Sequence, residues 1–288
     1  MTKTRATAIG FGAVLLWSLL ALFTVGSSPT PPLLLNTICF SIGGTLGLIW
    51  AWSNGGLRQL VDVPWTTYLF GTVGLFGYHA LYFSALRMAP AAEAGLIAYL
   101  WPLLIVLFSG LLPGEQLRVG HLIGACLGFA GAAVIIAGGG GAGFQFDHLP
   151  GYALALLCAL TWSSYSVLSR RLGDTPTSSV AIFCIAAAIA SGVMHFAVED
   201  TVWPDSAFGW ASVIALGLGP VGLAFYVWDI GVKQGDIQVL GTASYAAPLL
   251  STLALVLAGI AVPSGGLAIA ALLITGGAAI AARASMER

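Results

Sequence analysis

Charge is the scarcest property of this chain. Its 288 residues include 10 Lys and Arg and 11 Asp and Glu, so that 7 % of the chain is charged. About a quarter of the residues of a soluble domain are charged, and a hydrophobic fraction of 58 % with a mean hydropathy of +0.96 also excludes such a domain. The sequence has no basic run or cluster, which excludes a nucleic-acid partner. We expect membrane lipid and a small molecule as its partners.

Cysteine is also rare, and its spacing excludes redox and metal chemistry. Cys39, Cys126, Cys158 and Cys184 lie inside apolar runs, with no C-x-x-C spacing between them. We interpret them as small core residues. The sequence predicts neither a metal site nor a cofactor.

Long apolar runs are what the sequence has in quantity. A helix needs about 20 apolar residues to cross ~30 Å of hydrocarbon, and runs of that length recur between short polar, proline or glycine breaks. They predict an all-α polytopic membrane protein with ten transmembrane helices, near residues 5–25, 33–52, 66–86, 92–112, 118–138, 150–170, 179–198, 207–231, 238–260 and 264–282. The first run follows Lys3 and Arg5 as in a signal peptide, but its internal counterpart indicates that it is retained as a helix.

The basic residues test this count independently, because cytoplasmic loops of membrane proteins concentrate Lys and Arg. With the N-terminus inside, only Arg87 of the 10 Lys and Arg falls on the outer side. A wrong number of helices would mix the two sides. The charge distribution therefore supports ten helices with both termini in the cytoplasm.

The two halves of the chain repeat each other at an offset of about 145 residues. Trp17 then matches Trp162, and Pro102 matches Pro248. We predict two five-helix repeats, residues 1–142 and 143–288, together forming one transmembrane domain. Because five is odd, the second copy is inverted. Inverted repeats underlie many secondary transporters and place the substrate near the midplane, so the architecture predicts transport by alternating access.

Three features resemble the drug/metabolite transporter superfamily in its EamA-type branch. They are Gly114-Glu115 after the fourth helix, the Tyr-x-x-Pro pairs beginning at Tyr99 and Tyr245, and an alanine-rich last helix. The resemblance covers nearly the whole chain. One departure is that Glu115 aligns with Ala261, so it has no acidic counterpart in the second half.

Two segments are similar to the aromatic amino-acid exporters of that branch. They are Gly77-Tyr78-His79-Ala80-Leu81-Tyr82 and Ala98-Tyr99-Leu100-Trp101-Pro102. The resemblance implies efflux of Phe, Tyr, Trp and related compounds across the inner membrane of a bacterium. A broad drug or purine-type efflux carrier is the alternative, since an aromatic lining suits its substrates as well as aromatic amino acids. Uptake instead of export is also possible, because gradients set the direction of transport.

Prolines inside the predicted helices mark a first set of candidate residues. Pro102 frees the carbonyl of Ala98 and Pro248 that of Ser244, and Pro220 interrupts the eighth helix in the same way. In hydrocarbon a freed carbonyl must find a partner or line a cavity. The ammonium group of a substrate is one such partner, and a simple bend relieved by Ser, Thr or water is the alternative. These three prolines are our predicted flex points.

Aromatic side chains at mid-membrane depth are the second set. Lipid-facing Trp and Tyr prefer the interface, so rings at the midplane favour an inward orientation, where they bind planar substrates or pack against helices. His79 is the one histidine inside the predicted membrane, and it could bind a substrate carboxylate, couple protons, or donate a hydrogen bond while neutral. The predicted substrate-binding residues are Trp17, Tyr78, His79, Tyr82, Ala98, Tyr99, Trp101, Trp162, Ser244 and Tyr245.

The remaining charged and glycine residues have structural interpretations. Asp229 and Lys233 are four residues apart and predict a helical ion pair. Glu93 begins the fourth helix, where we expect it close to Arg87 across a short outer turn. Glycine stripes at 120, 124 and 128 and at 71, 74 and 77 permit close helix packing and, on the fifth helix, a homodimer.

A membrane-embedded enzyme is the rival from another class. It needs a nucleophile beside a base or a metal cluster. Ser84 and His79 are five residues apart and lie on different faces of a helix, and no acid orients the histidine. The sequence therefore disfavours catalysis.

Overall fold

The computed structural model describes residues 1–137, 145–172, 174–260 and 265–286, and this part of the chain contains helices and no strand. The first half holds α1 (Lys3–Trp17), α2 (Leu20–Gly26), α3 (Pro32–Ser53), α4 (Leu57–Val61), α5 (Trp65–Thr72), η1 (Val73–Gly77), α6 (Tyr78–Met88), α7 (Ala91–Ala98), α8 (Trp101–Ser109) and α9 (Val119–Ala137). The second half holds η2 (Phe146–His148), α10 (Leu149–Arg171), η3 (Thr177–Ser179), α11 (Val180–Val198), α12 (Ala207–Leu218), η4 (Gly219–Leu223), α13 (Ala224–Gln234), α14 (Ile237–Ala243), α15 (Ala246–Leu257) and α16 (Gly265–Met286). The predicted boundary between residues 142 and 143, and Ala261, lie outside the described residues.

Most of these helices join into segments that can cross a membrane. By length and composition the described residues contain 9 such spans, Lys3–Gly26, Pro32–Ser53, Trp65–Met88, Val119–Ile136, Phe146–Arg171, Thr177–Val198, Ala207–Gln234, Ile237–Leu257 and Gly266–Met286. The predicted run 92–112 corresponds to a shorter apolar helix, Glu93–Ser109. The chain is therefore a multi-pass membrane protein.

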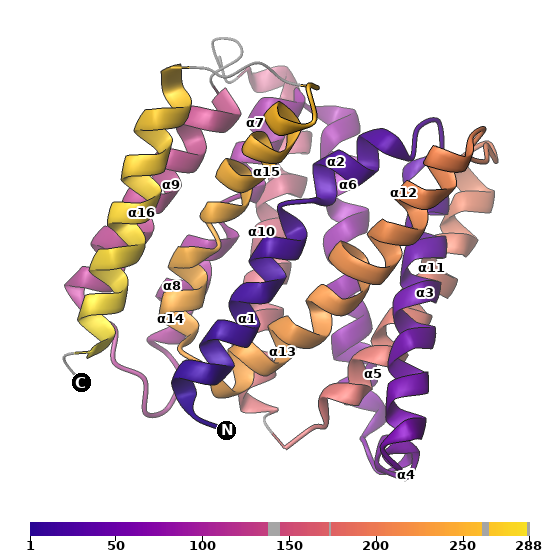
Figure 1. The fold of residues 1–288 in the computed structure, drawn as a ribbon, viewed down its shortest axis with the longest axis horizontal. Helices are drawn as coiled ribbons and strands as arrows, with labels where there is room; N and C mark the ends of the chain where they lie inside the picture. Colours follow the sequence, from indigo (N-terminus) through magenta and orange to yellow (C-terminus); the bar gives the residue numbers. More distant parts are fainter. Residues whose placement is uncertain (138–144, 173, 261–264, 287–288) are drawn as a thin grey trace.

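The spans stand side by side as one bundle (Figure 1). α1 begins and α16 ends at the same side of this bundle, the lower side in Figure 1. We call this side the terminal face and the other side the opposite face. α3 starts at the opposite face and α6 ends there, so these two helices run antiparallel.

Several spans are interrupted, and the interruptions of the two halves correspond. η1 and η4 are π-helices of five residues each. The offset that aligns the two halves of the sequence places η1 on η4. Between α7 and α8 the helix breaks at Tyr99 and Leu100, and between α14 and α15 it breaks at Ser244 and Tyr245. Pro102 lies in the first turn of α8, where a missing N–H leaves no hydrogen bond unmade.

The glycine stripes pack inside the chain. A Cβ at Gly124 would lie 2.5 Å from the carbonyl oxygen of Gly277 in α16, and one at Gly128 would lie 2.5 Å from the ring of Tyr245. Gly71 and Gly74 meet the rings of Phe183 and Tyr165 in the same way. These faces are covered by other helices of the same chain, so the expectation that the stripe of the fifth helix serves a dimer is wrong for this face.

An acidic residue organises the opposite face. The side chain of Glu199, which follows α11, is 3 % exposed and accepts hydrogen bonds from the N–H groups of Leu33 and Leu34 at the start of α3. It also pairs with Arg87 at 3.3 Å and with His195 at 3.0 Å. Carboxylates are favoured at helix N-termini. The one basic residue predicted on the outer side therefore has an acidic partner.

Glu93 and Arg87 do not meet as expected. Glu93 is buried and accepts a hydrogen bond from the hydroxyl of Tyr152 in α10, whereas Arg87 turns to Glu199. α6 and α7 both pack against α10, and Tyr152 of that helix takes Glu93 as its partner. The predicted pair of Asp229 and Lys233 is confirmed, with 2.9 Å between Oδ1 and Nζ.

Polar contacts join several helices at the terminal face, and we call them the terminal-face network. Arg170 of α10 pairs with Glu115 at 2.6 Å and donates to the carbonyls of Val232 and Gly235, each at 2.9 Å. Further contacts join Lys3 to Asp236 at 3.1 Å, the N–H of Asp236 to the hydroxyl of Thr7, and the amide of Gln238 to the carbonyl of Gln116.

Candidate substrate-binding site

Trp17, at the end of α1, is surrounded by other aromatic rings in the middle of the bundle. Its ring centroid lies 6.1 Å from that of Trp101 in α8, 5.8 Å from Trp162 in α10, 6.3 Å from Phe225 and 5.1 Å from Trp228, both in α13. Most of these pairs meet edge to face, the geometry that aromatic quadrupoles favour. Rings from four spans therefore form one aromatic cluster.

The cluster continues along α6. The rings of Tyr78 and Tyr82 lie parallel with 6.2 Å between centroids, and Tyr78 lies 5.5 Å from Trp162. One helical turn separates the two tyrosines, so both side chains leave α6 on the same face. The structure brings the predicted residues Trp17, Tyr78, Tyr82, Trp101 and Trp162 together.

Hydrogen bonds hold two of the indoles in place. The indole N–H of Trp17 donates to the carbonyl of Pro220 at 3.1 Å, and that of Trp228 donates to the hydroxyl of Ser166 at 3.1 Å. The carbonyl of Pro220 lies within η4, where the π-helix leaves the regular backbone pattern. A side chain of the first half of the chain thus donates to a backbone carbonyl of the second half.

His79 lies at the edge of the cluster and bonds to its own helix. Its Nδ1 is 2.7 Å from the carbonyl of Leu75, which is an acceptor, so Nδ1 carries a proton. The imidazole packs against the rings of Phe40 at 5.1 Å and Tyr78 at 5.2 Å. His79 thus donates a hydrogen bond to the neighbouring turn, and its roles in binding a substrate carboxylate or coupling protons stay predictions.

Tyr245 lies apart from the aromatic cluster. It is fully buried against Phe129 and α16, and its hydroxyl accepts the N–H of Leu103 at 3.0 Å. Tyr99 packs partly against the same residues. The cause is the helix break before each Tyr-x-x-Pro proline, which turns the tyrosine of the second half toward α9 and the backbone of α8.

The predicted polar floor is only partly present. Ala98 is buried at the end of α7. The carbonyl of Ser244, however, accepts the N–H of Ala247 at 3.1 Å, and its hydroxyl bonds to the carbonyl of Leu240. The expectation that Pro248 leaves the carbonyl of Ser244 without a partner is wrong, because a tight turn before α15 supplies one.

Three cluster residues were missed from the sequence. Phe40 of α3 stacks on Phe225 of α13 with 5.7 Å between centroids, and Trp228 stacks on Trp162 at 6.3 Å. The repeat offset matches Trp228 with Tyr82, and that correspondence was a usable signal. Phe40 and Phe225 carry no such signal, because phenylalanine is common throughout apolar runs.

Polar atoms in the cluster are uncharged. Among the described residues, the structure records no hydrogen bond to the hydroxyls of Tyr78, Tyr82 and Tyr99 or to the indole N–H groups of Trp101 and Trp162. The rings that make up the cluster carry no formal charge. The arrangement can stack a planar group and hydrogen-bond to its polar end, and it offers no nucleophile with a base.

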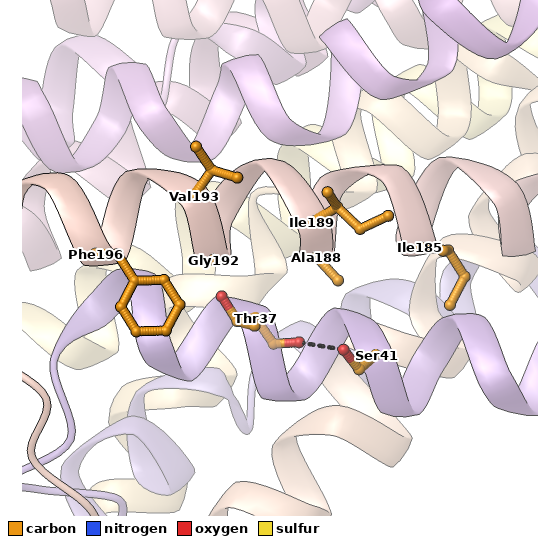
Figure 2. Close-up of a pocket in the computed structure, with 8 residues that line it drawn as sticks. All are labelled: Thr37, Ser41, Ile185, Ala188, Ile189, Gly192, Val193 and Phe196. Atoms are coloured by element: carbon orange, nitrogen blue, oxygen red, sulfur yellow. Dashed lines mark hydrogen bonds between the residues drawn. The ribbon is translucent and has the colours of Figure 1, made fainter.

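One groove of the surface lies away from the aromatic cluster. It has a volume of about 310 Å³ and runs between α3 and α11, where Ile189, Val193 and Phe196 project from one helix and Thr37 and Ser41 from the other (Figure 2). These three apolar side chains are largely exposed. An exposed apolar groove on two membrane-spanning helices is typical of a lipid-facing surface, and we place the substrate site at the aromatic cluster instead.

A multi-pass helical bundle with an uncharged aromatic cluster in its interior is the construction of a membrane transporter for small molecules. Residues 4–137 and 149–283 each match the EamA-like transporter family. The chain belongs to the EamA-like transporter family, and it is a transporter and not an enzyme.

Relatives of known name cover nearly all of the chain. It is 54 % identical, over 98 % of both chains, to the aromatic amino acid exporter YddG of Ancylobacter novellus. It is 25 % identical to the Escherichia coli K12 aromatic amino acid exporter YddG over 88 % of both chains. A crystal structure of a protein 54 % identical in sequence superimposes with a TM-score of 0.94 and covers 98 % of both chains.

Proposed function

We propose that this protein exports aromatic amino acids and related small amphipathic metabolites across the cytoplasmic membrane of a bacterium. The observation that carries the proposal is the ring of aromatic side chains around Trp17, in the middle of the bundle and without charge. The name of the relative with 54 % identity supports the same substrate class.

The binding site in this proposal is the aromatic cluster with its free polar atoms. The rings of Trp101 and Trp162 stack on or abut the aromatic side chain of the substrate, and each such contact contributes roughly 0.5–1.5 kcal/mol. The hydroxyls of Tyr78, Tyr82 and Tyr99 and the two indole N–H groups bind its ammonium and carboxylate groups. Ala98, His79 and the backbone around Ser244 and Tyr245 support these side chains from the edge of the site.

The proposed topology has ten transmembrane helices in two inverted five-helix repeats, residues 1–142 and 143–288, with cytoplasmic termini. The short helix Glu93–Ser109 is the tenth span and lies with the 9 longer ones. Matching interruptions at η1 and η4, and the two matches to the family, support the repeat. The terminal face is then the cytoplasmic face.

An asymmetry between the two faces supports transport by alternating access. Toward the terminal face α8 packs closely on α14, where a Cβ at Gly241 would lie 3.1 Å from the carbonyl of Pro102, and α10 packs on α13. The repeat-related pairs, α7 with α15 and α1 with α6, make no comparable backbone approach. In this proposal the structure is the state closed to the cytoplasm, and Pro102, Pro220 and Pro248 are the flex points.

The partners in this proposal are the substrate and membrane lipid. The groove between α3 and α11 takes an acyl chain. A homodimer stays a prediction and has to use a surface other than the glycine stripe of α9.

Efflux from proteoliposomes tests the function. Purified protein is reconstituted with radiolabelled Phe or Trp inside, with Ala and Leu as comparators, and with and without an imposed pH gradient. We expect faster flux of the aromatic than of the aliphatic amino acids without a gradient. No flux of any amino acid would contradict the proposal and favour a drug or nucleobase carrier instead.

A further inference from the structure

α3 supplies one fully buried ring to the aromatic cluster. Phe40 lies 5.1 Å from the imidazole of His79 and 5.7 Å from the ring of Phe225. Asn36 lies four residues earlier, one turn away on the same face of α3. The carboxamide of Asn36 therefore belongs to the inner face of α3, directly beyond the cluster.

Asn36 lies on the path from the cluster to the opposite face. α3 begins at that face, where the N–H of Leu33 bonds to Glu199, and Glu199 pairs with Arg87 in the last turn of α6. Phe83, which lies 6.4 Å from His79, follows the same direction along α6. Asn36 therefore lies one helical turn closer to the opposite face than Phe40 does.

The side chain of Asn36 is buried with its amide nitrogen unpaired. It is 6 % exposed, and its Nδ2 has no partner in the described part of the chain. The same holds for the hydroxyl of Ser191 in α11, which is 0 % exposed. A Cβ at Gly192 would lie 3.4 Å from Thr37, so α3 and α11 cross at this level. Two buried polar groups without partners therefore lie on adjoining helices at one depth.

The hydroxyls on the lipid side of α3 behave differently. Thr37 and Ser41 point into the groove on the lipid side (Figure 2) and donate to the carbonyls of Leu33 and Thr37 in their own helix, at 2.8 and 2.7 Å. Ser191 makes no such bond, although a helical serine usually can. An unpaired buried polar group lowers stability, and such groups are retained where function needs them.

We propose that Asn36, together with Ser191, forms a second binding station for the ammonium and carboxylate groups of the amino acid on its way to the opposite face. A carboxamide has two donors for a carboxylate and one acceptor for an ammonium, and a hydroxyl can serve either group. The proposal rests on the proposed function and adds a site on α3 and α11. Substrate passes from the aromatic cluster to this station with its ring still beside Phe40.

The test is a set of three variants, measured by efflux of Phe from proteoliposomes. Asn36→Leu keeps the size of the side chain and removes its polar atoms, and Ser191→Ala removes one oxygen. Thr37→Val is the matched control, because its hydroxyl is already bonded to its own helix. We expect KM for Phe to rise about tenfold in Asn36→Leu and about threefold in Ser191→Ala, while Thr37→Val stays within about twofold of wild type.

Two further readouts separate binding from a structural role. Wild type should discriminate Phe from 3-phenylpropanoate, which lacks the ammonium group, and Asn36→Leu should lose much of this discrimination. Because the substitution removes an unpaired buried amide, thermal unfolding of Asn36→Leu should occur at the wild-type temperature or above it. A structural role predicts a lower temperature and an unaltered preference.

Each result decides the proposal. Unchanged KM values in Asn36→Leu and Ser191→Ala, with wild type active on Phe, would overturn the second station and leave the proposed function intact. An Asn36→Leu protein that unfolds earlier or does not fold would also overturn it. Failure of wild type itself to carry Phe would instead count against the proposed function.

Discussion

Trp17 and Pro220 are 203 positions apart, yet the indole N–H of Trp17 donates to the carbonyl of Pro220 at 3.1 Å. The bond joins α1 to the π-helix η4. It fixes the central ring of the aromatic cluster against a backbone carbonyl of η4. The hydrogen bond thus connects the aromatic cluster directly to the π-helix η4.

Trp17→Phe keeps an aromatic ring and removes the hydrogen bond that the indole N–H donates to the carbonyl of Pro220. We expect a loss of about 1–3 kcal/mol in the free energy of unfolding, seen as earlier thermal unfolding in detergent. Trp203→Phe is the control, since Trp203 is 53 % exposed and stacks only on Trp210. Equal unfolding temperatures for the two variants would show that the bond adds nothing.

Gly10→Ala should disturb the crossing of α1 and α13. A Cβ at Gly10 would lie 2.7 Å from the Cα of Gly231, closer than real contacts allow, so the two backbones must separate. Overpacking of this kind costs about 1–3 kcal/mol. At Gly12 the nearest atom would be 3.9 Å away, and Gly12→Ala should be neutral or slightly stabilising. Thermal unfolding of both variants checks the contrast.

Arg170→Met should weaken the terminal-face network far more than Arg171→Met. Arg170 pairs with the nearly buried Glu115 and two carbonyls, whereas the exposed Arg171 reaches only the carbonyl of Leu111, at 3.4 Å. Breaking a buried pair costs about 3–5 kcal/mol, and an exposed contact costs within about 0.5 kcal/mol. Chemical or thermal unfolding of the two variants measures this, and similar losses would refute the ranking.

Alanine in place of Tyr78, Tyr82, Trp101 or Trp162 should reduce efflux of Phe and Trp about tenfold or more while membrane insertion is retained. The reason is the loss of ring contacts and of the hydroxyl or N–H groups that we assign to the substrate. Trp65→Ala serves as the control, because Trp65 is 72 % exposed. Wild-type efflux in all four variants would remove the aromatic cluster from the proposed site.

Glu199→Gln should loosen the opposite face. The amide keeps an acceptor for the start of α3 but loses the charge that pairs with Arg87 and His195. We expect a loss of about 1–3 kcal/mol in the free energy of unfolding. Asp200→Asn alters the exposed neighbouring acid and should have little effect. The comparison is made by thermal unfolding, and no difference between the variants would contradict the role of Glu199.

The sequence by itself determined that this is a multi-pass helical transporter, because both decisive signals are local or periodic. Apolar runs of membrane length can be counted along the chain. A constant offset between the two halves is enough to match Pro102 with Pro248. The sequence also selected five of the central aromatic residues, since a ring away from the interface has to turn inward. Family membership and the named relatives confirm the transporter class.

Only the tertiary structure decided which residues meet. Tyr99 and Tyr245 match in sequence, yet helix breaks turn the hydroxyl of Tyr245 toward the backbone of α8. Glu93 and Arg87 are close in the chain but bind different helices. Phe40 and Asn36 look like any other residues of an apolar helix until its inner face is known. Partners of this kind depend on how helices rotate about their axes and cross, and packing between distant segments sets both.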